Sequence, residues 1–180
     1  GEVRDPQVQR FAPKLIGSLD RAIQFLTRTL TYGQAREQPP QRERLDLRAL
    51  SADVIDAFAF LGGKSVTYRN DVPAGTVAEA DREQVTRILT NLVRNAVQAL
   101  EQGDGSGTVT IAGERQGSVA LLHVSDTGPG IPEAVRGRLF AAFQSAAKSG
   151  GTGLGLAISA ELAEAHGGSL KVARTGPGGT

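Results

Sequence analysis

The stretch Asp126-Thr-Gly-Pro-Gly-Ile-Pro132 follows an apolar run in the glycine-rich second half of the chain. A carboxylate at the end of a strand can accept a hydrogen bond from an exocyclic amine, such as that of adenine. Gly128 and Gly130 would let the backbone pass close beneath a flat ring, because glycine carries no side chain. An aspartate followed by glycine is also a common turn. Taken alone, the stretch favours the turn.

A pair of asparagines lies upstream, in Asn91-Leu-Val-Arg-Asn-Ala96. Residues four apart on a helix share one face, so Asn91 and Asn95 are expected side by side. Mg²⁺ prefers oxygen ligands and completes its shell with waters and substrate phosphates. An asparagine carbonyl suits that role, although a pair of surface or capping asparagines would have the same spacing.

A third motif lies downstream, in Gly151-Thr-Gly-Leu-Gly-Leu156, where the last predicted helix begins. Free amides at a helix start bind phosphate, helped by the helix dipole, and glycines allow close approach. The spacing is neither that of the dinucleotide-binding fingerprint nor that of the Walker A loop, since no Gly-Lys-Ser/Thr follows. The motif alone is a weak indication of a phosphate site.

The flanking sequence predicts alternating helices and strands. Asp46 and Asp81 are expected to cap helices, with Gln84 as the capping-box partner of Asp81. Glycines Gly167-Gly168 should end the last helix. The predicted helices cover residues 47–61, 82–100 and 154–166, and the predicted strands cover 65–70, 76–80, 108–114, 118–125 and 169–173. This pattern indicates an α+β fold, a two-layer α/β sandwich.

Residues 7–36 are predicted to form one long helix in front of this domain. Its apolar residues recur at three- and four-residue steps and form two stripes, which implies partner helices as in a bundle. Pro39-Pro40 marks a linker. We therefore divide the chain into residues 1–38 and 39–180.

The composition excludes several classes of function. The 20 Lys and Arg residues nearly balance the 19 Asp and Glu residues, so no nucleic-acid partner is expected. Without cysteine there is no disulfide or thiolate metal site, which is compatible with a reducing compartment. No apolar run approaches the ~20 residues that cross a bilayer. We expect a cytoplasmic location and no membrane contact by this chain.

In order and spacing, the three motifs together resemble the N, G1 and G2 boxes of the ATP-binding catalytic domain of bacterial sensor histidine kinases. That domain has the Bergerat-type fold shared with gyrase, MutL and heat-shock chaperone ATPases. Leu139-Phe-Ala-Ala-Phe143 is similar to the F box, and Glu164-Ala-His-Gly-Gly168 is close to the kinase form. The resemblance covers about residues 44–175.

The resemblance implies two cofactors, ATP and Mg²⁺, and a role for each site residue. Asn95 would be the main Mg²⁺ ligand, with Asn91 beside it, and Asp126 would read adenine. Residues 141–150 would form a mobile lid. The other implied nucleotide-binding residues are Gly128 and Gly130 at the base, Ile131, Phe143 and Leu156 in the walls, Gly151, Thr152, Gly153, Leu154 and Gly155 at the phosphates, and Arg94 or Lys148 as a cation.

The family transfers the ATP γ-phosphate to a histidine on a two-helix hairpin. Phe11–Arg36 resembles the second hairpin helix, so the acceptor histidine lies outside this chain, and we expect no phosphotransfer by the chain alone. The resemblance also implies homodimerisation through the hairpin, a response-regulator receiver domain as partner, and a final apolar strand after Thr180. Many relatives carry a basic residue where this chain has Gln98.

Two other functions stay open. A non-catalytic nucleotide-sensing module is slightly favoured by Gln98. A Bergerat-type ATPase that drives conformational change typically carries a glutamate where this chain has Asn91, and an amide cannot act as that base.

Of the two histidines, His123 is predicted to be structural on a strand, and His166 to lie at a helix C-terminus, where the dipole favours it.

Overall fold

A computed structural model describes residues 39–61, 65–103, 105–141 and 153–180 of the chain. The predicted helix over residues 7–36 and all but the first residue of the predicted lid lie outside the described residues. The elements are β1 (Glu43–Asp46), α2 (Leu47–Leu61), β2 (Val66–Asp71), β3 (Val77–Ala80), α3 (Arg82–Glu101), β4 (Gly107–Gln116), β5 (Val119–Asp126), α4 (Glu133–Arg136) and α5 (Gly155–Ala165).

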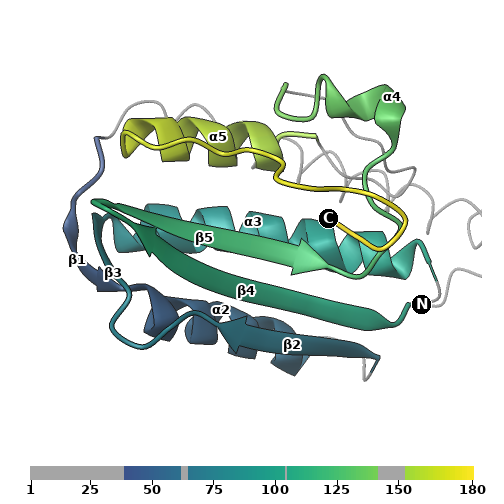
Figure 1. Cartoon of the computed structure of the whole chain (residues 1–180), viewed down its shortest axis with the longest axis horizontal. Coiled ribbons are helices and arrows are strands. Elements are labelled where there is room, and N and C mark those ends of the chain that lie inside the picture. Colours follow the sequence, from purple (N-terminus) through teal and green to yellow (C-terminus); the bar gives the residue numbers. More distant parts are fainter. Residues whose placement is uncertain (1–38, 62–64, 104, 142–152) are drawn as a thin grey trace, which may run out of the picture.

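The larger sheet has the order β2-β4-β5 and is covered by helices on one face (Figure 1). β2 runs parallel to β4, with Val66 opposite Gly107, whereas β4 and β5 form an antiparallel hairpin. A second sheet pairs β1 with β3 antiparallel. The α+β sandwich predicted from the sequence is confirmed, but β1 was missed, because four residues ending in an exposed aspartate carry too short a pattern.

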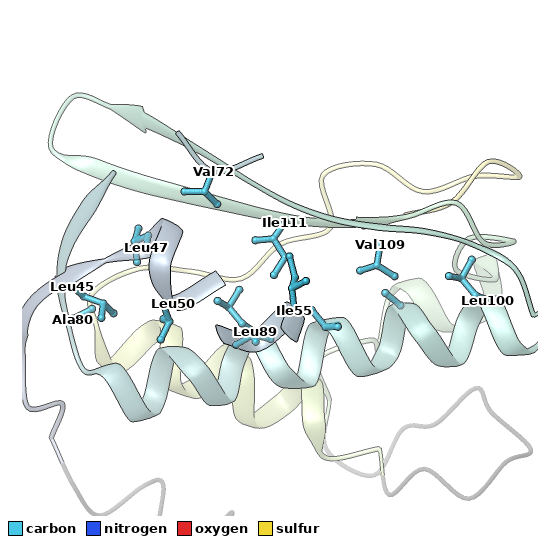
Figure 2. Packing of buried hydrophobic residues seen from close by; sticks show 13 residues of the cluster. Leu45, Leu47, Leu50, Ile55, Val72, Ala80, Leu89, Leu100, Val109 and Ile111 are labelled. Atoms are coloured by element: carbon cyan, nitrogen blue, oxygen red, sulfur yellow. The ribbon is translucent and has the colours of Figure 1, made fainter. Parts of the chain in front are cut away.

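The hydrophobic core lies between the sheet and helices α2 and α3. Figure 2 shows Leu89 and Leu100 of α3 facing Val109 and Ile111 of β4. The buried residues of α3 recur every three or four positions, which turns one stripe of the helix toward the sheet. Burying each large aliphatic side chain stabilises the fold by roughly 1.5–3 kcal/mol.

Both predicted helix caps are formed. Asp46 Oδ1 accepts the backbone N–H groups of Arg48 and Ala49, and Asp81 Oδ1 accepts that of Gln84 at 3.0 Å. The reciprocal half of the predicted capping box was wrong. The backbone N–H of Asp81 donates instead to Nε2 of His166 at 3.0 Å, because the C-terminus of α5 packs beside the start of α3.

The end of the chain differs from the prediction. α5 stops where Gly167 takes a left-handed φ of 80°, as expected. The predicted strand over residues 169–173 is wrong, since this stretch joins no sheet in the described part of the chain. A strand needs a neighbouring strand to pair its backbone groups. At the end of β5, the backbone N–H of Asp126 donates to the Thr180 carbonyl and not to residues 169–173. No described helix combines the length and apolar character of a membrane span.

Candidate active site

A cavity of about 700 Å³ opens between α3, α5, the end of β5 and the segment leading into α4. Its wall contains residues from all three motifs, from Asn91 of the first to Leu156 of the last, although these motifs lie far apart in the chain. The predicted site residues that line it are Asn91, Arg94, Asn95, Asp126, Gly130, Ile131, Gly153, Leu154, Gly155 and Leu156.

Asp126 ends β5 at one side of the cavity. Its Oδ1 accepts the backbone N–H of Gly128 at 2.8 Å, so the carboxylate caps its own turn. The carboxylate is half-buried and lines the cavity, where its remaining lone pairs can accept a donor from a ligand. Burial raises the pKa of Asp126, partly offset by the backbone N–H donors from Gly128 and Thr180. The turn that the sequence favoured is therefore present, and the carboxylate that caps it also faces the cavity.

The two glycines after Asp126 have different structural roles. Gly130 lines the cavity with a left-handed φ of 78°, and a Cβ there would lie 2.2 Å from the carbonyl oxygen of Gly176. Gly128 is buried and does not line the cavity, but a Cβ there would lie 2.8 Å from Asp126 Oδ1. Backbone geometry thus requires glycine at Gly130, whereas a side chain at Gly128 would displace the Asp126 carboxylate from its place in the turn.

Asn91 joins the two helices that border the cavity. Its Nδ2 donates to the Gly155 carbonyl at 3.2 Å and to Ser159 Oγ at 3.3 Å, while Ser159 Oγ donates to Gly155 O at 2.9 Å. The amide nitrogen is thus used by the protein, and the carbonyl Oδ1 is left without a partner among the described residues. Asn95 lines the same cavity one turn later.

These two amide oxygens fit a hard cation such as Mg²⁺, which takes oxygen ligands. Within the described residues, no group of three or more His, Cys, Asp or Glu side chains could hold a metal by itself. A cation at Asn91 and Asn95 would therefore need ligand oxygens and water to complete its shell, as magnesium sites with bound phosphates do.

The start of α5 contributes backbone rather than side chains. Leu154 is the N-cap and makes no side-chain capping bond, so the first amides of the helix are available to an anion. The Leu154 side chain is fully buried against Ile158 and Leu162, and only its backbone can serve the site. Gly153 has a left-handed φ of 66°, which brings the chain close to the cavity.

The sequence predicted only some of the positively charged side chains that line the cavity. Arg94 borders the cavity but is exposed to solvent, and Gln98 also lines it. Arg87, which the sequence analysis missed, lines the cavity one turn before Asn91, and burial lowers its pKa. Arg87 makes no ion pair with another described residue. The four-residue spacing from Asn91 was the signal that could have found it.

Several predicted positions fall outside the described residues, namely Phe143, Lys148, Gly151 and Thr152. Leu139 and Phe140, the described part of the F-box motif, line the cavity. Lys171 and Arg174 line it as well and were not predicted, because the stretch that carries them was interpreted as a strand.

Residues 80–180 match the family model described as histidine kinase-, DNA gyrase B-, and HSP90-like ATPase. The chain belongs to this family. The matched region contains the asparagine pair, Asp126 and the described glycines of the cavity. ATP binding by a domain of this family agrees with the arrangement of a half-buried carboxylate, two asparagine side chains and the start of α5 around one cavity.

Within this ATPase family, the chain is homologous to sensor histidine kinases. It is 34% identical over 148 residues to the C4-dicarboxylate transport sensor protein DctS of Rhodobacter capsulatus, covering 81% of this chain and 22% of that protein. The chain spans only 14% to 28% of the length of the curated relatives compared with it.

Solved kinase structures show the same fold. The catalytic domain of histidine kinase ThkA matches with a TM-score of 0.61 and 28% identity, over 69% of this chain and 80% of that one. Full-length ShkA in complex with AMPPNP matches with a TM-score of 0.73 and 25% identity, over 97% of this chain and 38% of that one.

Proposed function

We propose that this chain binds Mg-ATP in the cavity and transfers the γ-phosphate to a histidine on a phosphoacceptor hairpin, as part of a two-component sensor kinase. One observation supports this above the others. Asn91, Asn95, Asp126 and the start of α5 come from separate segments and line one cavity. Each of the three motifs is weak alone, and their convergence in one cavity is what a nucleotide site requires.

Different residues of the cavity contact different parts of the nucleotide. The Asp126 carboxylate accepts the adenine amine, and Gly130 gives the base room. The amides at the start of α5 hold the phosphates, and Arg87 adds positive charge. Asn91 and Asn95 would hold Mg²⁺, which neutralises phosphate charge when bound. The protein then contributes positioning and electrostatic stabilisation, which dominate phosphoryl transfer.

The asparagine pair favours phosphotransfer over hydrolysis. An ATPase needs a base to activate water, and the amide of Asn91 cannot remove a proton. Its nitrogen is also committed to Gly155 and Ser159. A histidine imidazole, by contrast, carries its own lone pair and needs mainly to be placed in line with the γ-phosphate.

The parent protein would supply the remaining parts. We propose that residues 1–38 form the second hairpin helix, that residues 39–180 form the catalytic domain, that two hairpins form a homodimer, and that a response-regulator receiver domain accepts the phosphoryl group. Histidine kinase ThkA in complex with the response regulator protein TrrA supports the receiver domain as partner. The proposed location is the cytoplasm.

The test is transfer in trans. The chain would be incubated with radiolabelled ATP, Mg²⁺ and a separately produced phosphoacceptor hairpin of the parent protein. We expect acid-labile label on the hairpin, as for a phosphoramidate. The Asn95→Ala variant should lose it, whereas Gln116→Ala, an exposed amide at the far end of β4, should keep it. Nucleotide binding without any transfer would favour the nucleotide-sensing module, and phosphate release without label would favour the ATPase.

A further inference from the structure

Three hydrogen bonds connect four residues around His166, at the end of α5 away from the cavity. We call Gln41, Arg42, Asp81 and His166 the His166 node. The backbone N–H of Asp81 donates to His166 Nε2 at 3.0 Å, and Gln41 N–H donates to Asp81 Oδ2 at 2.8 Å. Arg42 Nη2 donates to the His166 carbonyl at 3.1 Å. The node therefore ties the segment before β1 to the start of α3 and the end of α5.

The partners of the ring determine its protonation state. A backbone N–H can only donate, so Nε2 must accept from Asp81 and carries no proton. Nδ1 lies 2.7 Å from the Leu162 carbonyl, which can only accept, so Nδ1 carries the proton. His166 is therefore neutral and in its Nδ1–H form. A charged ring would turn an N–H toward the N–H of Asp81 and break that bond.

Helix α5 connects the node to the nucleotide cavity. Its first residue, Gly155, accepts a hydrogen bond from Asn91, and its C-cap is His166. α5 is thus attached to α3 at both ends, and residues 39–42 join the far attachment. Hydrogen bonds weaken steeply with misalignment, so a small shift of α5 against α3 would be felt in the node.

We propose that His166 is a positioning residue that couples nucleotide binding at the start of α5 to residues 39–42, the segment joining residues 1–38 to the domain. This rests on the proposed function, since the hairpin must be presented to the bound γ-phosphate. Coupling of this kind is reciprocal, so a change imposed on the segment also alters nucleotide affinity.

The first test is the tautomer. Long-range ¹H–¹⁵N spectra of the ¹⁵N-labelled chain at neutral pH should show His166 protonated at Nδ1 and unprotonated at Nε2. The chain has two histidines, so His123→Gln assigns the signals without touching the node. A protonated Nε2 would overturn the assignment and, with it, the hydrogen bond to Asp81.

The second test is amide hydrogen exchange with and without AMPPNP. In the native chain, AMPPNP should protect residues 155–158 and change exchange at Gln41 and Asp81 by at least about fivefold. In His166→Leu, Asp81 should exchange about tenfold faster, since its N–H loses its acceptor, and the response at Gln41 should vanish. His166→Gln, whose carbonyl can replace Nε2 as acceptor, should restore both.

The outcomes separate the two proposals. Protection of residues 155–158 without a response at Gln41 in the native chain would overturn the coupling alone, as would a full response at Gln41 in His166→Leu. No protection at residues 155–158 would overturn the proposed function as well. Equal acceleration of the slow β4 amides in His166→Leu would show a merely structural histidine.

Discussion

The Asp126 carboxylate is the group that we propose reads the adenine amine. It caps its own turn through Oδ1 and also lines the cavity. We expect Asp126→Asn to weaken ATP binding by roughly 10- to 100-fold from a Kd near 1 μM, because an amide accepts the amine less well than a carboxylate. Calorimetry with ATP and GTP would measure this. Asp71→Asn, an exposed aspartate on β2, is the control. Unchanged ATP affinity in the Asp126 variant would remove the adenine role.

The ionisation of Asp126 should be visible in the pH dependence of binding. Burial raises its pKa above that of an ordinary aspartate, about 3.9. The charged form is the better acceptor, so ADP affinity should fall as the pH drops through this raised pKa. Titrations of ADP across the acidic range would test it, with Asp126→Asn as reference for the titration of ADP itself. Parallel curves for the two proteins would contradict the prediction.

Turns and caps act at the scale of elements, and the turn after β5 tolerates no side chain at Gly130. A Cβ there meets the Gly176 carbonyl at 2.2 Å, and φ is left-handed. Gly130→Ala should cost at least about 1 kcal/mol of unfolding free energy and displace the residue 176–179 turn. Gly137 ends α4 with φ −66° and open space, so Gly137→Ala should be nearly neutral. Urea denaturation of both variants is the measurement, and equal stability would refute the clash.

The N-cap of α3 should make stability depend on acid. Burial alone would raise the pKa of Asp81, but N–H donors from Gln84 and Gln41 outweigh it and lower the pKa. A folded pKa below the unfolded one gives stability that is complete above about pH 4 and lost as the pH falls through the folded value. Asp81→Ala should therefore cost about 1 kcal/mol at pH 7 and less in acid.

Urea unfolding at several pH values would show the Asp81 effect, with Asp46→Ala, the cap of α2, for comparison. Among the described residues, Asp46 accepts two local N–H groups and none from outside its own turn. A cost of Asp81→Ala that stays constant down to the lowest pH would show that ionisation of this cap does not contribute.

At the scale of the whole molecule, we predict that the chain binds nucleotide without labelling itself. His166 uses both ring nitrogens in the fold. His123 is exposed and lines the cavity, but it is fixed on β5 with Nε2 3.6 Å from Glu114, and we expect this position not to bring it in line with the γ-phosphate. Incubation with radiolabelled ATP and Mg²⁺ should leave the chain unlabelled while calorimetry shows binding. Stable label that disappears in His123→Gln or His166→Gln would overturn the site and the claim of an external acceptor.

The amino-acid sequence by itself determined the features that depend on near neighbours. The caps at Asp46 and Asp81, the stripe of α3, the β4–β5 hairpin and the stop at Gly167 follow from contacts within a few residues. The order of the three motifs was also sufficient to indicate the family, which the match over residues 80–180 shows.

Only the tertiary structure decided the features that join distant parts of the chain. β1 forms because it pairs with β3. Residues 169–173 form no strand because no described strand pairs with them. The backbone N–H of Asp81 donates to the His166 ring across 85 positions of the chain, and the Arg42 side chain donates to the His166 carbonyl across 124 positions. Such contacts depend on how helices pack rather than on local pattern, so the His166 node could be identified only in the folded chain.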